Sequence, residues 1–200
     1  MYLRKSTLFI RLFTLSAVLG IAAVSFAKEP TKAAFPNVNI KNFGQMDDRF
    51  YRGAQPKEGD YRDLAALGIK TVIDLREDPV SYERNSVEAS GMRYINIPMS
   101  DSVYPKAETI DRFLKIVDDP ATGKFFVHCA GGRHRTGVMG AVYRFTHSHW
   151  NYDQAYAEMK SYDFYTRWGH GAMKDFVQDY WQHIEAGQNG KSAAATQSNK

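Results

Sequence analysis

The chain contains a single cysteine, Cys129, in 200 residues, so it forms no internal disulfide. It has no Cys-x2-Cys pair and no His-Glu-x-x-His segment, the spacings typical of common zinc sites. No run of lysines and arginines is interleaved with aromatic residues, so nothing indicates a nucleic-acid-binding surface. We find no internal repeat and no organic-cofactor motif. The lone cysteine is therefore better explained by chemistry than by a scaffold, and we predict no cofactor.

Long hydrophobic runs are also scarce. The N-terminal apolar segment, residues 12–26, is 15 residues long, whereas a spanning helix needs roughly 20. Basic residues come before it, and Ser25 and Ala27 form an A-x-A-like cleavage site. This order predicts a signal peptide over residues 1–27 and export to the periplasm or beyond. The alternative is an uncleaved anchor made by residues 12–26, the only case in which we expect a membrane contact.

The apparent basicity of the chain comes largely from this segment. Residues 1–27 hold three basic and no acidic residues, so their removal lowers the formal charge from +4 to +1. Hydrophobic residues make up 44% and charged residues 24%, which are globular values. We predict a flexible lead over residues 28–36, one domain over 37–186 and a disordered Gly/Ser/Ala/Gln-rich tail over 187–200.

Apolar runs that alternate with amphipathic patterns predict an α/β domain with a mainly parallel central sheet flanked by helices. The expected strands cover residues 38–43, 49–52, 69–75, 92–98 and 125–128. The expected helices cover residues 56–67, 81–90, 107–117, 136–145, 151–162 and 173–184. Asn151, three residues before Gln154, predicts a capping box at the start of the fifth helix.

The segment around Cys129 carries the clearest chemical pattern. A short apolar strand precedes the cysteine, and a helix begins shortly after two adjacent glycines. Such a loop points successive backbone N–H groups inward and makes an anion site at the positive end of the helix. The same field favours a thiolate, and Arg135 adds a planar fork that holds two phosphate oxygens. We predict a phosphate site formed by Ala130, Gly131, Gly132, Arg133, His134 and Arg135.

These residues also carry a family resemblance. The segment His128-Cys129-x5-Arg135-Thr136-Gly137 resembles the signature loop of the cysteine-dependent protein tyrosine and dual-specificity phosphatases. The segments Arg133-His134-Arg135-Thr136-Gly137 and Tyr51-Arg52-Gly53-Ala54-Gln55-Pro56 are similar to those of the atypical dual-specificity phosphatases first described from plants and fungi. The resemblance covers about residues 42–164. It departs at Ala130, where that branch often has a polar or basic residue.

The resemblance implies the phosphatase fold and a set of residue roles. Cys129 is expected to attack phosphorus and form a phosphocysteine, which water then hydrolyses. Arg135 and the loop N–H groups are expected to hold the equatorial oxygens. His128 would orient the loop and support the thiolate. Thr136 would donate its hydroxyl to the sulfur, although a helix N-cap is its plainer role.

A general acid must protonate the leaving oxygen. Asp101 is our prediction because it lies in a Ser/Asp/Pro loop after a strand. The resembled family places its general acid on such a loop, roughly 30 residues before the cysteine, and Asp101 precedes Cys129 by 28 residues. A solvated turn residue is the alternative for Asp101. Asp74 is the weaker candidate, because a carboxylate within a buried strand more often pairs with a neighbour such as Arg76. Arg52 is expected in a surface ion pair, with a phosphate contact as the alternative.

The sequence leaves the substrate open. Arg133 and His134 make the rim of the loop cationic, which suits an inositol phosphate or phosphoinositide, but an ordinary rim serves phosphotyrosine or phosphoserine/threonine equally well. Three other interpretations are a non-catalytic phosphate-binding module, a rhodanese-like sulfurtransferase and a metal enzyme. The last would use Cys129 with His128, His134, His147 and His149. We predict instead a monomeric, metal-free phosphomonoester hydrolase that binds no nucleic acid.

Overall fold

The computed structural model describes residues 35–198, with side chains described up to residue 187. The predicted signal peptide and nearly all of the predicted lead lie outside the described residues. Among the helices that are described, none combines the length and the hydrophobicity that a membrane span requires.

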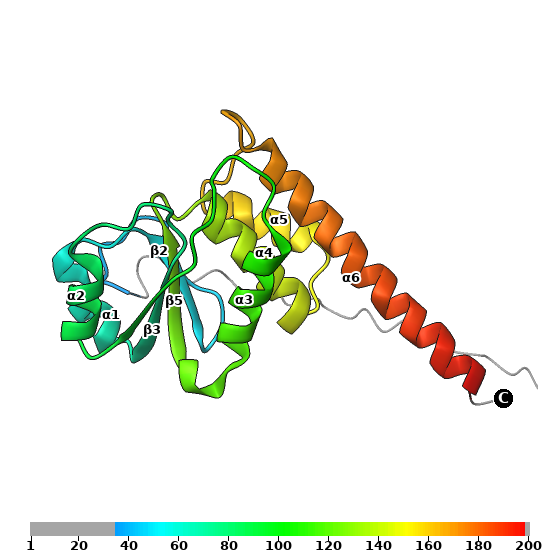
Figure 1. The fold of residues 1–200 in the computed structure, drawn as a ribbon, viewed down its shortest axis with the longest axis horizontal. Helices are drawn as coiled ribbons and strands as arrows, with labels where there is room; N and C mark the ends of the chain where they lie inside the picture. The colour runs from blue at the N-terminus through cyan, green and yellow to red at the C-terminus, as the bar shows by residue number, and fades with distance from the viewer. Residues whose placement is uncertain (1–34, 199–200) are drawn as a thin grey trace, which may run out of the picture.

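A five-stranded sheet forms the centre of the domain (Figure 1). Its strands are β1 (Gly44–Gln45), β2 (Phe50–Ala54), β3 (Ile69–Asp74), β4 (Arg93–Asn96) and β5 (Lys124–Cys129). They stand in the order β1-β2-β5-β3-β4. β1 pairs antiparallel with β2 and all other pairs are parallel, which confirms the predicted, mainly parallel sheet.

Helices cover both faces of the sheet (Figure 1). One face carries the short helix η2 (Glu58–Asp60), α1 (Tyr61–Ala66) and α2 (Glu83–Ala89). The other carries α3 (Ala107–Asp118), α4 (His134–His147), α5 (Tyr152–Ser161) and α6 (Gly171–Ser198), and η3 (Pro120–Thr122) leads from α3 into β5. The expected α/β architecture is thus confirmed.

The sequence of β5 shows why two layers form. Phe125 and Val127 belong to the core under α3 to α6, whereas Phe126 belongs to the core under α1 and α2. Alternate side chains of a strand point to opposite faces, so an apolar strand needs cover on both. All three side chains are fully buried, and each burial contributes roughly 1.5–3 kcal/mol.

Helix α4 is buried along almost its whole length, because the sheet, α3, α5 and α6 surround it. Its Arg144 is buried, and the Nε atom lies 3.1 Å from both carboxylate oxygens of Glu158 in α5. This two-oxygen contact is the stronger kind of ion pair. It joins α4 to α5, whose predicted capping box is also present, with both Asn151–Gln154 hydrogen bonds at 3.0 Å.

Two predictions differ from the structure. The expected strand over residues 38–43 is wrong: Val38 and Ile40 are buried, but the backbone turns at Lys41 and Asn42, and the strand comes later, at β1. Asn42 has φ +52°, a left-handed conformation that asparagine tolerates. The second difference is the tail, because α6 continues to Ser198 and extends away from the body of the domain (Figure 1). The prediction of disorder gave no weight to the helix propensity of the alanines at 193–195.

Candidate active site

The site lies where the parallel strands end. β5 ends at Cys129 between the ends of β2 and β3, and α4 begins at His134. The carboxyl ends of parallel strands share one edge of a sheet, the usual place for ligands in open α/β folds. Residues 129–135, the signature loop, thus have the strand–loop–helix context that their motif requires.

A cavity of about 370 Å³ opens over the signature loop. It is lined by Asp101, Cys129, Ala130, Gly131, Arg133, His134, Arg135, Tyr165 and His170. The structure therefore brings Asp101 to the same cavity as Cys129. A larger cavity of about 490 Å³ lies between residues 35–43 and 161–162, and Cys129 is not part of its lining.

The carbonyl groups of the signature loop are held from outside. Three consecutive oxygens accept hydrogen bonds: Ala130 O from Gln55 N–H (3.3 Å), Gly131 O from Asn42 Nδ2 (2.8 Å) and Gly132 O from an Arg52 terminal nitrogen (2.6 Å). In a planar trans peptide the N–H points opposite to the C=O. These contacts therefore turn the following N–H groups toward the opposite side, which favours the predicted anion site.

Gly132 is required by the approach of β2 to the loop. Its φ is +65°, and a Cβ atom there would lie 2.4 Å from the carbonyl carbon of Gly53. Any side chain would push the loop away from β2 and break the contacts that orient its carbonyl groups.

Arg52 corrects a prediction. Its side chain is fully buried, so the expected surface ion pair is wrong. The guanidinium lies 3.9 Å from the centre of the Tyr162 ring and donates to the carbonyl of Gly132. The reason is the position of Arg52 in β2, directly beside β5. It supports the loop and does not line the cavity.

Cys129 is 3% exposed. Burial by itself raises the pKa of its thiol, but the Thr136 hydroxyl, the Arg135 charge and backbone N–H groups outweigh it and lower the pKa. The Thr136 oxygen is buried and makes no other hydrogen bond within the described part of the chain, so its proton is available to the sulfur. The start of α4 adds its positive dipole end.

Several buried donors beside the cavity remain available for an anion. Arg135 donates to the carbonyl of Met99 at 3.3 Å, but its Nε has no partner among the described residues. The Nε of Arg133 is likewise buried without a partner in that part of the chain. Buried polar groups are normally hydrogen-bonded, so this cluster favours a bound phosphate.

His134 is a weaker cation than expected. Burial lowers its pKa to about 4, with further contributions from His170 and Arg133. The ring therefore carries no charge at neutral pH. Of the two residues predicted to make the rim cationic, only Arg133 is charged. His134, Tyr165 and His170 instead form an aromatic wall of the cavity.

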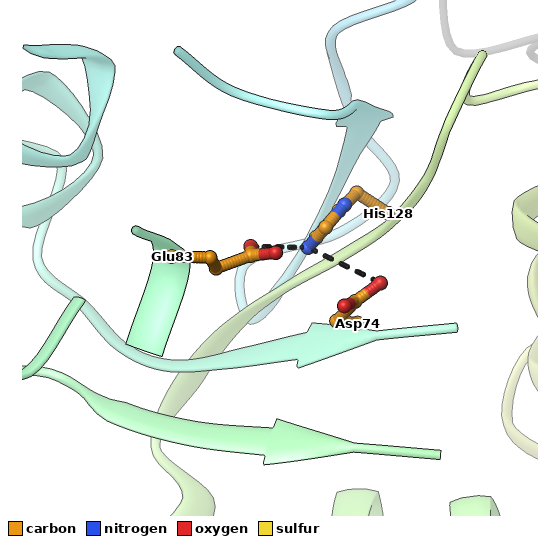
Figure 2. Close-up of side chains that lie close together, drawn as sticks. All are labelled: Asp74, Glu83 and His128. Carbon is orange, nitrogen blue, oxygen red and sulfur yellow. Dashed lines mark ion pairs between the residues drawn. The ribbon is translucent and has the colours of Figure 1, made fainter. Parts of the chain in front are cut away.

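His128 does not line the cavity. It lies buried with Asp74 and Glu83 (Figure 2). Its Nε2 is 2.7 Å from Glu83 Oε1 and 3.9 Å from Asp74 Oδ1. Protein donors also reach both carboxylates, namely the Tyr61 hydroxyl (2.9 Å) and Gln55 Nε2 (3.1 Å) on Glu83, and the Tyr94 hydroxyl (2.9 Å) and Arg76 N–H (2.8 Å) on Asp74.

The charges in this cluster follow from its contacts. Burial lowers the pKa of His128, but the contact with Glu83 outweighs burial and raises it. Burial raises the pKa of Glu83, but His128 outweighs burial and lowers it. The pKa of Asp74 is raised by burial, which the His128 charge only partly offsets. His128 and Glu83 thus form a charged pair directly behind the nucleophile.

Asp74 is therefore not placed to act as a general acid. It is fully buried and does not line the cavity. The expected partner, Arg76, gives it only a backbone N–H, while the Arg76 guanidinium binds Gln55 and Asp78 at 3.0 Å each. Asp101, by contrast, is exposed at the mouth of the cavity.

Metal-ligand geometry occurs in one place within the described residues. Donor atoms of Asp74, Glu83 and His128 all lie within 4.8 Å of one another. The protein donors that already occupy these carboxylates favour the ion pair instead. The set of histidines considered from sequence is not brought together, because His147 pairs with Asp118 at 2.8 Å and stacks on Tyr143.

Sequence reasoning missed five residues of the site. Three of them, Asn42, Gln55 and Glu83, support the loop or His128, and two, Tyr165 and His170, line the cavity. Each lies more than 30 residues from Cys129, and four of them stand outside the motifs read from the sequence. Only Gln55 had a signal, because it belongs to the segment that resembles the atypical phosphatases.

Comparisons with known proteins agree with this geometry. Probable NAD kinase 2, chloroplastic, of Oryza sativa subsp. japonica is 31% identical over 101 residues, 48% of this chain and 10% of that protein. Dual specificity protein phosphatase TpbA of Pseudomonas aeruginosa (strain UCBPP-PA14) is 25% identical over 150 residues, 74% of this chain and 66% of that protein. The chain thus spans about a tenth of the first relative and two thirds of the second.

A solved structure shows the same fold. The core catalytic domain of PP-IP phosphatase SIW14 from S. cerevisiae, in complex with citrate, superposes with a TM-score of 0.62 at 21% identity, over 76% of this chain and 94% of that one. The model of a family described as "DSP-PTPase phosphatase fused to NAD+ Kinase" matches residues 30–178. Since that match covers most of the chain, the protein belongs to the DSP-PTPase phosphatase family.

Proposed function

We propose that this chain is a phosphomonoester hydrolase of the dual-specificity type that acts through a phosphocysteine. One observation carries the proposal: a cysteine with a lowered thiol pKa lies at a cavity where three consecutive loop carbonyl groups are held from outside. The Nε atoms of Arg133 and Arg135 beside it have no partner among the described residues. A nucleophile and an anion site thus converge on one phosphate.

The residues divide the reaction into two steps. The Cys129 sulfur attacks phosphorus while the bond to the leaving oxygen breaks, and Asp101 gives that oxygen its proton. Arg135 and the loop N–H groups hold the equatorial oxygens as charge spreads over them. Water, activated by the Asp101 carboxylate, then attacks the phosphocysteine. The Thr136 hydroxyl stabilises the departing thiolate, and the His128–Glu83 pair supports the loop from behind.

Aromatic phosphomonoesters such as phosphotyrosine are our first substrate class. The uncharged His134 ring, Tyr165 and His170 form a wall of rings that suits a planar leaving group. An inositol phosphate is the second candidate, because Arg133 remains on the rim and the SIW14 domain is called a PP-IP phosphatase. Export, supported by the pattern of residues 1–27, would place the substrate outside the cytoplasm, and we propose a monomer.

The test of the proposed function is hydrolysis of p-nitrophenyl phosphate in the presence of EDTA. We expect full activity with the chelator and inhibition by vanadate, which mimics the transferring phosphoryl group. Rates on phosphotyrosine peptides, phosphoserine peptides and inositol phosphates then rank the substrates. Binding of phosphate without turnover would support a non-catalytic module, and a requirement for added zinc would contradict the mechanism.

Asp101→Asn tests the general acid. Because the amide donates no proton to the leaving oxygen, we expect kcat to fall about 100-fold for phenyl phosphate. Its leaving group has a pKa near 10, like tyrosine. The loss should be small for p-nitrophenyl phosphate, which needs little protonation. Asp111→Asn, an exposed aspartate of α3 outside the cavity, is the control, and an equal loss on both substrates would remove Asp101 from this role.

A further inference from the structure

The cavity wall formed by the segment between α5 and α6, residues 162–170, contributes rings to the proposed substrate site but has so far no role in protonating the leaving group. Its last residue, His170, reaches across to the segment between β4 and α3, residues 97–106, which carries Asp101. The His170 Nδ1 atom lies 2.6 Å from the Asp101 carbonyl oxygen. A carbonyl oxygen only accepts, so Nδ1 must carry the proton and donate it.

His170 is itself held in place by ring contacts. Its ring stacks on His134, with centroids 3.6 Å apart and planes at 16°. Tyr165 meets both rings edge-on, at 4.4 Å from His134 and 5.5 Å from His170. His170 therefore connects the signature loop, through His134, to the segment that carries Asp101.

The segment that carries Asp101 has little other support at that residue. Up to Met99 it follows β3, with a Met99 N–H hydrogen bond to Leu75 at 3.2 Å and the Arg135 contact on the Met99 carbonyl. Beyond Asp101, an exposed Tyr104 donates its hydroxyl to Asp179. Within residues 35–198, the hydrogen bond from His170 is the one made at Asp101 itself.

Two consecutive residues before His170 have left-handed backbone conformations, which turn the chain so that His170 faces the segment of Asp101. Trp168 has φ +62° and Gly169 has φ +87°. A left-handed conformation at a residue as bulky as tryptophan is unusual and strained. A Cβ atom at Gly169 would lie 4.0 Å from the Cβ of Ser102, so the two segments run close together here.

We propose that His170 is a positioning residue that holds Asp101 over Cys129 through its hydrogen bond to the Asp101 carbonyl and its stacking on His134. The inference rests on the proposed function, since it assigns His170 to the protonation of the leaving group. A displacement of about 1 Å in a catalytic group costs up to 100-fold in rate. A donor at the backbone of Asp101 therefore matters for substrates that need the acid.

The experiment compares His170→Phe with His170→Asn in the full chain. Phenylalanine keeps a ring against His134 but has no donor, whereas the asparagine amide keeps a donor near the position of Nδ1. We expect His170→Phe to lower kcat roughly 10-fold for phenyl phosphate and less than about 2-fold for p-nitrophenyl phosphate. His170→Asn should recover most of the loss. His147→Phe, a histidine remote from the cavity, should leave both rates unchanged.

A double variant separates positioning from a general structural effect. If His170 acts through Asp101, His170→Phe should add almost nothing to the loss already caused by Asp101→Asn on phenyl phosphate. Additive losses, or an equal loss on both substrates in the single variant, would overturn the role of His170. Failure of the proposed function looks different, because wild-type protein would then hydrolyse neither substrate or would need a metal.

Discussion

Cys129→Ser abolishes turnover, with kcat lower by roughly 10⁴-fold or more. A serine hydroxyl in the same place keeps its proton, because the features that lower the thiol pKa fall far short of ionising an alcohol. The phosphate site should survive, since the carbonyl contacts and Arg135 are unchanged. The measurement is kcat on p-nitrophenyl phosphate, together with calorimetric binding of vanadate or phosphate.

The binding measurement makes this result interpretable. If the variant binds phosphate within a few-fold of the wild type and melts at a similar temperature, the lost activity belongs to the sulfur. Cys129→Ala, which removes the nucleophile and the hydroxyl, is the matched control and should behave in the same way. Turnover that survives in either variant would exclude the phosphocysteine mechanism.

The second large effect concerns stability. Glu83→Gln keeps the shape of the side chain but removes the negative charge beside His128. Removing one partner of a buried ion pair costs about 3–5 kcal/mol. We expect a loss of roughly 3 kcal/mol in the free energy of unfolding at pH 6, because Asp74 stands 3.9 Å from His128 and His128 can also release its proton.

The stability that the His128–Glu83 pair contributes depends on pH in a direction set by the two pKa shifts. The pKa of His128 is raised above 6.5, so its contribution is complete below pH 6.5 and is lost as the pH rises through the folded-state pKa. The pKa of Glu83 is lowered below 4.5, so its contribution is complete above pH 4.5 and is lost as the pH falls through the folded-state pKa. The pair stabilises the fold most between pH 4.5 and 6.5.

Urea unfolding at pH 6 and pH 9 measures the effect. The gap between Glu83→Gln and wild type should be largest at pH 6 and should narrow at pH 9. Glu88→Gln is the control in the same helix, because Glu88 forms an exposed pair with Arg84 at 3.5 Å and such pairs contribute about 0–1 kcal/mol. A gap of equal size at both pH values would mean that His128 is uncharged in the folded protein.

Much of the fold could be predicted because its signals are local. Both β3 and β5 carry apolar residues on each face, which indicates buried parallel strands, and both strands appear where expected. The capping box at Asn151 needs only four consecutive residues. The wrong strand at residues 38–43 also comes from a local signal. Val38 and Ile40 alternate with polar residues as in a strand, but this alternation shows only that both side chains are buried and does not show that the segment pairs with another strand.

The residues of the active site also fall into those that a local pattern predicts and those that only distant contacts bring to the site. Eleven consecutive residues around Cys129 determined the nucleophile, the phosphate loop and the arginine, because a strand, a loop and a helix start impose that geometry on their own residues. The strand order β2-β5-β3 decided the rest. It sets Arg52 and Gln55 against the carbonyls of the signature loop and Glu83 against His128, and residues 162–170 bring His170 to Asp101. These are contacts between residues far apart in the chain, and no local pattern specifies which distant side chain will meet a buried charge. The sequence alone thus determined what reacts at this site, and the tertiary structure decided what holds it in place.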